Sequence, residues 1–280
     1  MSKRSQIQHH VQKLGEIGDI MRAMKNVSLM ETHKLARFLN QQRQVLASIE
    51  QACTDFVSFN PEFHVEAHHT NRLLLALGTE RGFCGDFNES IASALSVLLA
   101  EFHSQSTQVL VVGSRLASKI ANDCPNVAGQ LEAPSVVEEV QSVLVSVVEK
   151  LMALHGNSAT SPQLSVTVLF HEDGSDGVTI REVSPANAFG KPFTPTGFAP
   201  LIQLPKAKLY AELARHYLWA QMHDIFYSSL MAENRSRLRH MEQAIQRLEE
   251  KTADLQRRQN ILRQEEITEE IEVIMLNANH

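Results

Sequence analysis

A cysteine between two glycines is the group in this sequence that most resembles a catalytic nucleophile. Cys84 lies within the segment Gly78-Thr-Glu-Arg-Gly-Phe-Cys-Gly-Asp-Phe-Asn88, which directly follows an apolar run typical of a buried strand. A sharp turn from a strand into a helix can hold a nucleophile, and a thiol there needs a histidine as its base. His171, at the end of a later predicted strand, is the candidate base. One interpretation is therefore a cysteine-dependent hydrolase.

The same segment allows two other interpretations. Gly82 and Gly85 resemble the start of a phosphate-binding loop, but the pattern G-x-x-x-x-G-K-[ST] is absent from it. The remaining interpretation is a tight turn, in which the glycines let the backbone bend and the thiol packs as a small apolar group. We expect the tight turn, with no catalytic residue and no cofactor.

The other potential metal ligands are poorly spaced. They are two pairs of adjacent histidines and three cysteines, namely His9/His10, His68/His69, Cys53, Cys84 and Cys124. Adjacent histidines do not share a helix face as residues at i and i+4 do, and the cysteines form no C-x-x-C pair. We therefore expect no metal site and no disulfide framework, which is typical of a reducing compartment.

Two long helices are expected to hold the middle of the chain between them. Residues 206–280 contain no glycine and no proline, and as one helix they would be about 110 Å long. Residues 1–60 also contain no proline and only two glycines. A helix of this length must pair with another element, and the other end of the chain is the nearest candidate. The sequence predicts an antiparallel coiled coil made of residues 1–60 and 206–280, with a domain of residues 61–205 inserted at its base.

The C-terminal helix has a heptad seam with steps of three and four residues. It consists of Leu238, Met241, Ile245, Leu248, Thr252, Leu255, Gln259 and Leu262. Thr252 and Gln259 are polar residues at core positions, which usually fix the register of a coiled coil at a cost in stability. After Leu262 the apolar phase shifts to Ile267, Ile271 and Ile274, so we expect this last segment to leave the seam.

The N-terminal helix has a less regular apolar stripe, which we expect to form its half of the seam. The stripe consists of Ile20, Met24, Val27, Glu31, Lys34/Leu35, Phe38, Val45, Ile49, Ala52 and Phe56.

The central residues are typical of an α/β domain. The pattern predicts strands at 72–78, 108–113, 164–170 and 178–183, with helices over about 86–102, 116–121 and 135–155. Ser135 and Glu138 are expected to form a capping box at the start of the last of these helices. Strands that alternate with helices favour a small, doubly wound, mostly parallel sheet covered on both faces. The proline-rich residues 185–205 are expected to form an extended return to the C-terminal helix.

Charge and hydropathy exclude several classes of protein. Residues 1–58 carry 8 basic and 5 acidic side chains, residues 59–205 carry 7 and 15, and residues 206–280 carry 11 and 12. The N-terminal helix is too weakly basic for nucleic acid and better suited to an acidic protein partner. No apolar run reaches the length of a membrane span, and the first residues lack the apolar stretch of a signal peptide. We expect neither a signal peptide nor a transit peptide.

Taken together with the motifs at both ends, the sequence resembles the gamma subunits of F-type rotary ATP synthases. The residues that carry the resemblance are Ile20-Met-Arg-Ala-Met-Lys-Asn-Val-Ser28, Arg81-Gly-Phe-Cys-Gly-Asp-Phe-Asn88, Met231-Ala-Glu-Asn-Arg235 and Asn260-Ile-Leu-Arg-Gln-Glu-Glu-Ile-Thr-Glu-Glu-Ile271. The resemblance spans the whole chain and is most specific in the C-terminal motif. It implies a non-catalytic rotor shaft that stands in a hexamer of alpha and beta subunits and rests on the epsilon subunit and the c-ring. Peripheral attachment to the cytoplasmic face of a bacterial inner membrane, through the complex, would follow.

The resemblance also implies partner contacts. Met24 and Lys25 would meet an acidic loop of a beta subunit, with Lys34 and Arg37 further along the same helix. Arg263 and Gln264 would bind a second loop higher in the hexamer, with Thr268 nearby, and a guanidinium suits that role because it can hold a carboxylate with two hydrogen bonds.

The chain departs from the family pattern in two stretches. The first is Ile17-Gly18-Asp19, where many members have Thr-Gln-Lys, and the second is Ala199-Pro-Leu-Ile-Gln-Leu-Pro205, where a tyrosine and acidic residues are usual. We expect Leu201 and Ile202 to pack against the epsilon subunit or the c-ring. The divergence suggests a second-copy enzyme of a bacterium. A free coiled-coil adaptor with an α/β head is the alternative to a rotor subunit.

Overall fold

The computed structural model describes residues 3–64, 73–102, 107–121, 127–155, 165–175, 177–189 and 198–278. The elements in chain order are α1 (Lys3–Phe59), the 3-10 turn η1 (Pro61–Phe63), β1 (Leu73–Leu77), α2 (Phe87–Phe102), β2 (Gln108–Val112), α3 (Ser114–Ile120), β3 (Val127–Leu131), the 3-10 turn η2 (Val137–Glu139), α4 (Val140–His155), β4 (Val166–His171), β5 (Val178–Val183), α5 (Ala186–Phe189) and α6 (Lys206–Ala278). The chain divides into two compact units. We call Met1–Leu29 with Arg237–His280 the two-helix unit, and Met30–Ser236 the sheet unit.

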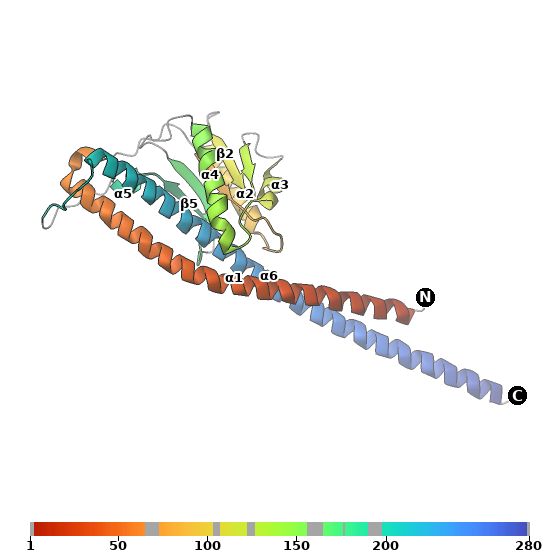
Figure 1. Cartoon of the computed structure of the whole chain (residues 1–280). Coiled ribbons are helices and arrows are strands. Elements are labelled where there is room, and N and C mark those ends of the chain that lie inside the picture. The colour runs from red at the N-terminus through yellow and green to blue at the C-terminus, as the bar shows by residue number, and fades with distance from the viewer. Residues whose placement is uncertain are drawn as a thin grey trace. The chain divides into compact units, whose positions relative to one another are not determined.

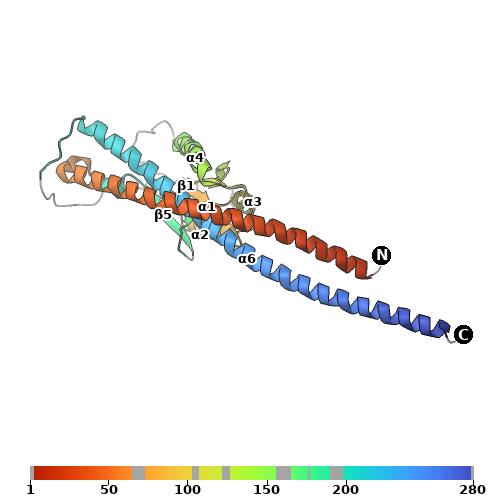
Figure 2. The same cartoon turned by 60° about the horizontal axis from the view of Figure 1, so that its bottom comes forward.

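In the two-helix unit, the first part of α1 packs antiparallel to the last part of α6 (Figures 1 and 2). Every residue of the predicted C-terminal seam from Leu238 to Leu262 is buried or half-buried, including the polar Thr252 and Gln259. Ion pairs cross the pair of helices at Arg22–Glu249 (3.0 Å) and Arg4–Glu266 (3.1 Å). The predicted coiled coil and the register of its C-terminal half are confirmed.

The end of α6 leaves the seam as expected. Ile267, Ile271 and Ile274 have 46, 51 and 66% of their surface exposed. In both views the end of α6 extends beyond the N-terminal end of α1 (Figures 1 and 2). This stretch of α6 presents apolar side chains to the solvent.

The predicted phase of α1 is wrong over much of its length. Four members of the predicted stripe are largely exposed, namely Ile20 (62%), Val27 (51%), Phe38 (45%) and Val45 (50%). Glu31, Leu35 and Phe56 of the predicted stripe are buried as expected, and the other buried positions are Leu14, Gly18, Ser28, Leu39, Cys53 and Val57. The helix therefore carries two apolar stripes, one against its own chain and one on the surface, and the predicted stripe mixed members of both.

The sheet unit contains one five-stranded sheet in the order β3-β2-β1-β4-β5. All neighbouring strands are parallel except β4 and β5, which form an antiparallel pair from Val166↔Val183 to His171↔Val178. The expected mostly parallel α/β sheet is confirmed. The strand β3 was not predicted, because its sequence Val-Ala-Gly-Gln-Leu is short, contains a glycine and is only partly buried.

Both faces of the sheet are covered. The central strand β1 is buried at all five positions, as expected of a strand inside a parallel sheet. Leu74 and Ala76 face a core formed with α2 and α3. Leu73, Leu75 and Leu77 face a second core that includes α4, Leu35 and Leu39 of α1, and the α6 residues Met222, Ile225, Phe226, Leu230 and Met231. The ends of the chain thus contribute to the core of the sheet unit.

The predicted capping box at the start of α4 is wrong in its acidic member. The 3-10 turn η2 precedes α4, and the backbone N–H of Ser135 donates to the carboxylate of Glu139 (2.7 Å) rather than to that of Glu138. Glu138 pairs with Lys34 of α1 instead (3.1 Å). The extra 3-10 turn moves the capping acid one residue along the chain.

Candidate functional site

The turn after β1 is closed by a reciprocal pair of side-chain hydrogen bonds. The backbone N–H of Thr79 donates to Oδ1 of Asn88 (3.0 Å), and Nδ2 of Asn88 donates to the Thr79 hydroxyl (2.9 Å). Both residues are buried. Next to them, the Glu80 carboxylate reaches the first residue of α3, Ser114. The turn is therefore held by its own side chains and has no empty cradle that a phosphate would fill.

The backbone of this turn takes conformations that favour glycine. Phe83 has a φ of 66° and Gly85 a φ of 61°. A bulky residue with positive φ is an outlier, and the Phe83 side chain is also 53% exposed. Gly78 is required by crowding, since a Cβ there would lie 2.2 Å from Cβ of Leu116. Backbone conformation thus explains Gly85 and crowding explains Gly78, whereas a Cβ at Gly82 would meet only Nη2 of Arg115, at 4.0 Å.

Cys84 and His171 do not form the nucleophile and base of a hydrolase. The Cys84 side chain is buried, and its Sγ lies 3.7 and 3.5 Å from the carbonyl oxygens of Arg81 and Gly82. Nε2 of His171 lies 2.8 Å from the Ser90 hydroxyl and 3.1 Å from the Phe87 carbonyl oxygen. Burial lowers the pKa of His171 despite the hydrogen bond to the Phe87 carbonyl oxygen. The geometry supports the tight-turn interpretation.

The structure brings together no metal site in the part of the chain that it describes. No group of three or more His, Cys, Asp or Glu side chains there has the arrangement that a metal ion needs. Cys53 and Cys84 are both buried. Burial and the nearby Glu50 carboxylate raise the pKa of the Cys53 thiol to about 12. Cys124 and the pair His68/His69 lie outside the described residues.

Two of the predicted partner-contact residues on α1, Lys25 and Lys34, form ion pairs within the chain. Lys25 is half-buried and pairs with Glu242 of α6 through a contact of 2.6 Å, and Met24 beside it is also half-buried. Lys34 lies between Glu31 (3.0 Å) and Glu138 (3.1 Å), and these hydrogen bonds raise its pKa. Arg37 is exposed.

The predicted partner contacts on α6 face the solvent. Arg263, Gln264 and Thr268 are all exposed, and the Thr268 hydroxyl donates to the Gln264 carbonyl oxygen (2.9 Å) within the helix. Before the helix, Leu201 is 90% exposed. Ile202 is partly buried against the cluster that includes Cys53, Phe56, Phe189 and Tyr217.

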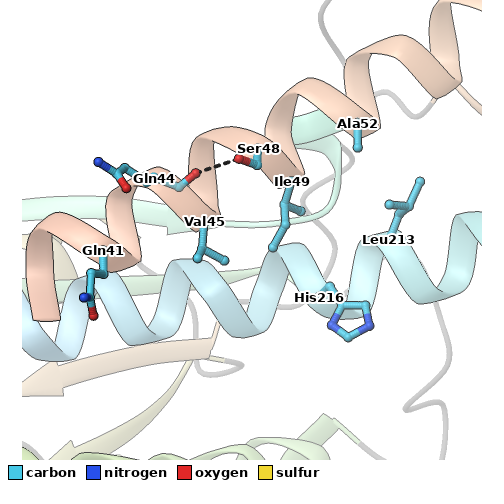
Figure 3. Close-up of a pocket in the computed structure, with 8 residues that line it drawn as sticks. All are labelled: Gln41, Gln44, Val45, Ser48, Ile49, Ala52, Leu213 and His216. Carbon is cyan, nitrogen blue, oxygen red and sulfur yellow. Dashed lines mark hydrogen bonds between the residues drawn. The ribbon is translucent and has the colours of Figure 1, made fainter.

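A shallow groove with a volume of about 560 Å³ lies between α1 and α6 in the sheet unit. Figure 3 shows its lining residues, Gln41, Gln44, Val45, Ser48, Ile49 and Ala52 of α1 with Leu213 and His216 of α6. The Ser48 hydroxyl donates to the Gln44 carbonyl oxygen (2.9 Å) and so is already satisfied. The lining is apolar with an amide rim, and it lacks the converging charged groups of a nucleotide or cofactor site.

Sequence reasoning missed a buried ionic contact in the sheet unit. Asp224 of α6 pairs with Arg181 of β5 at 3.1 Å and is only 7% exposed. The one local signal is a charged residue between Met222 and Phe226 in an otherwise apolar part of α6. Its partner lies 43 residues away in the sequence, so spacing could not reveal the pair.

No described helix has the length and apolarity needed to cross a membrane. A family model described as ATP synthase matches residues 3–279 of the chain, which is almost its whole length.

Three solved structures share the fold. A chain in the central stalk and c-ring structure of the Tetrahymena thermophila mitochondrial ATP synthase is 19% identical, with a TM-score of 0.57, covering 80% of this chain and 99% of that one. Two chains from structures of the Euglena gracilis mitochondrial ATP synthase are each 13% identical. The match in rotational state 3 has a TM-score of 0.60 and covers 97% of this chain and 92% of that one. The match in the rotor in rotational state 1 has a TM-score of 0.56 and covers 94% and 98%. With the family match over residues 3–279 and the paired terminal helices around one α/β sheet, the chain belongs to the ATP synthase family as a gamma subunit, a non-catalytic part of an enzyme complex.

Proposed function

We propose that this chain is the central-stalk rotor subunit of an F-type ATP synthase. The observation that carries the proposal is the match of the ATP synthase family model over residues 3–279, both helices of the shaft included. The same family match decides against the free adaptor and against the cysteine hydrolase. Rotation of the shaft couples ion flow to ATP synthesis or hydrolysis.

The physical basis of the coupling is the asymmetry of the shaft. A rotor with different side chains on each side favours a different conformation in each nucleotide-binding subunit that it faces. The surface stripe of α1, which includes Ile20 and Val27, is apolar. The end of α6 carries glutamates as well as exposed isoleucines. The two-helix unit therefore has different faces. A shaft can act in this way without binding a nucleotide itself.

Within the hexamer, we infer two sets of contacts. Met24, Lys25, Lys34 and Arg37 meet an acidic loop of a beta subunit, where the Lys25 ammonium exchanges Glu242 for a carboxylate of the partner. Arg263, Gln264 and Thr268 meet a second loop. The exposure of all three residues on α6 supports this assignment, since an arginine that is free to reorient can grip a carboxylate with two hydrogen bonds.

In the sheet unit, we infer that Leu201 and Ile202 contact the epsilon subunit or the c-ring. The exposure of Leu201 supports this, because an apolar side chain that is 90% exposed is typical of a contact surface when others, such as Phe198 and Leu204, lie beside it. We place the complex at the cytoplasmic face of a bacterial inner membrane, where this subunit is peripheral. That location rests on the divergent stretches 17–19 and 199–205 of the sequence.

Rotation in a reconstituted complex tests the function. A cysteine introduced at the exposed Ser175 of the turn between β4 and β5 would carry the probe, in a chain that also has Cys124→Ser. The native Cys53 and Cys84 are buried and should not compete for the label. The labelled chain is mixed with alpha and beta subunits immobilised as a hexamer, and the probe is followed after ATP is added.

We expect rotation in one direction that stops when ATP is removed. The control is the same hexamer with a labelled chain that ends before residue 237. This chain lacks the part of α6 that belongs to the two-helix unit. Failure of the full chain to join the hexamer, or a probe that is bound but stationary in ATP, would contradict the proposed function.

A further inference from the structure

An ionic contact in the sheet unit joins the sheet to both long helices. Oδ2 of Asp224 on α6 lies 3.1 Å from Nη1 of Arg181 on β5. Its other oxygen, Oδ1, lies 3.5 Å from Nε of Arg43 on α1. One carboxylate thus faces an arginine from the sheet and an arginine from the other helix.

The Asp224–Arg181 pair is well fixed. The Asp224 side chain is only 7% exposed, and a carboxylate in such a place is costly unless it is paired. The second branch of Arg181, Nη2, contacts the Glu172 carboxylate at 2.7 Å. The guanidinium also lies over the ring of the buried Phe170, 5.1 Å from its centre. Arg181 is therefore held on three sides, and its position defines where Asp224 must be.

Two more polar contacts follow along the same side of α6. The backbone N–H of Asp173 donates to the Ser228 hydroxyl (3.0 Å), and the Asp173 carboxylate pairs with Arg235 (2.6 Å). Asp224, Ser228 and Arg235 are four and seven residues apart, which places them on one face of a helix. We call the set of contacts among Asp224, Arg181, Arg43, Glu172, Ser228, Asp173 and Arg235 the polar clamp.

The polar clamp can do what the apolar core beside it cannot. Burial of apolar surface opposes separation of the sheet from the helices, but it is non-directional. Charge-assisted hydrogen bonds have a defined geometry and fix the register of the surfaces that they join. A rotor that is driven at one part and loaded at another experiences tangential force between its parts.

We propose that Asp224 and Arg181 are positioning residues that lock α6 and α1 to the sheet, so that torque passes between them without slip. This inference rests on the proposed rotor function. It assigns torque transmission to the Asp224–Arg181 pair, in which the carboxylate is buried. Loss of this pair would leave assembly possible but make the coupling of ion movement to ATP hydrolysis inefficient.

Ion pumping per ATP hydrolysed tests the inference. Complexes that contain Asp224→Asn or Arg181→Gln would be reconstituted into vesicles, and ATP hydrolysis and ATP-driven ion uptake would be measured on the same sample. We expect the ratio of ions moved to ATP hydrolysed to fall by about twofold or more, a change typical of residues that carry coupling. Asp224→Glu, which keeps the charge, should restore most of the ratio.

The matched control is Glu212→Gln, which removes a carboxylate from the same helix but breaks exposed contacts with Arg215 and His216 within α6. This variant should pump normally. A purely structural role for Asp224 would reduce the amount of assembled complex without changing the ratio, and that result would overturn the inference. Failure of both Asp224→Asn and Arg181→Gln to assemble would overturn it too, because the pair would then serve folding. If a complex assembled without this chain hydrolyses ATP and pumps ions as well as the wild-type complex does, the proposed function itself is wrong.

Discussion

The Glu80 carboxylate accepts a hydrogen bond of 2.6 Å from the hydroxyl of Ser114, which begins the helix after the neighbouring strand β2. It also accepts the backbone N–H groups of Ser114 and of Ala133, each at 3.1 Å. One side chain therefore joins the ends of β1, β2 and β3. Burial opposes ionisation of Glu80, but these hydrogen bonds outweigh it and lower the pKa of the carboxyl below its ordinary value.

We predict that Glu80→Gln destabilises the chain by about 1–2 kcal/mol near neutral pH, because an amide cannot accept all the hydrogen bonds that a carboxylate accepts. Since the pKa of Glu80 is lower in the folded chain than in the unfolded one, its contribution is complete above the unfolded pKa. It is lost as the pH falls through the folded pKa.

Urea unfolding of both variants between pH 7 and pH 3 checks this. The difference in unfolding free energy should shrink toward the acidic end. Glu89→Gln, which removes an exposed carboxylate paired with Lys119, is the control and should have little effect at any pH. A difference for Glu80→Gln that is constant with pH would contradict the prediction.

For the hexamer contact, we predict that Arg263→Ala with Gln264→Ala lowers ATP turnover of the assembled complex by about fivefold, the loss expected when an interface arginine is truncated. Subunit stoichiometry should remain intact, because both side chains are exposed and support nothing in their own chain. The control is Gln256→Ala with Arg257→Ala, two exposed residues of the same types one heptad earlier. Normal turnover in the first double variant would remove this pair from the interface.

At the proposed contact with the epsilon subunit or the c-ring, Leu201→Asp should weaken the attachment of the subunit to the membrane part of the complex. It should not change the stability of the isolated chain. Leu201 is 90% exposed, so its replacement disturbs no core of its own. Sedimentation of the complex with membranes measures the loss. Val97→Asp on α2, at a residue that is 60% exposed, should sediment like the wild type. Ile202→Asp is a poorer probe, because Ile202 also packs against its own chain and the charge would disturb that packing.

The end of α6 should be ordered mainly by its partners. Glu265, Glu266, Glu269, Glu270 and Glu272 crowd this segment, and like charges three or four residues apart destabilise an isolated helix by about 0.2–0.5 kcal/mol per pair. They also lie toward the C-terminus, where the helix dipole favours cations. Hydrogen exchange should therefore be fast for residues 263–276 in the free chain and slow in the complex. Strong protection in the free chain would show that the segment needs no partner.

The sequence predicted those elements whose signal is local. The α6 seam could be located because its steps of three and four continue without a glycine or proline, and the buried strands β1 and β2 because they are short apolar runs. The phase of α1 could not, since periodicity does not distinguish a stripe that contacts its own chain, such as Leu14 and Leu39, from one on the surface, such as Ile20 and Val27. The contacts of Glu80 and Asp224 could not be predicted either, because Ser114 lies 34 residues from Glu80 and Arg181 lies 43 residues from Asp224.

The pairing of the two ends of the chain also sets the order in which it can fold during synthesis. Arg4 contacts Glu266, which is 262 residues later, and the core beside β1 needs Met222–Met231. Neither unit can be completed while those residues are still inside the ribosome. The nascent α1, with both of its apolar stripes unpaired, must wait for nearly the entire polypeptide to be made, and contacts this distant close slowly. A chaperone that shields an amphipathic helix during translation would therefore meet this chain at its N-terminus.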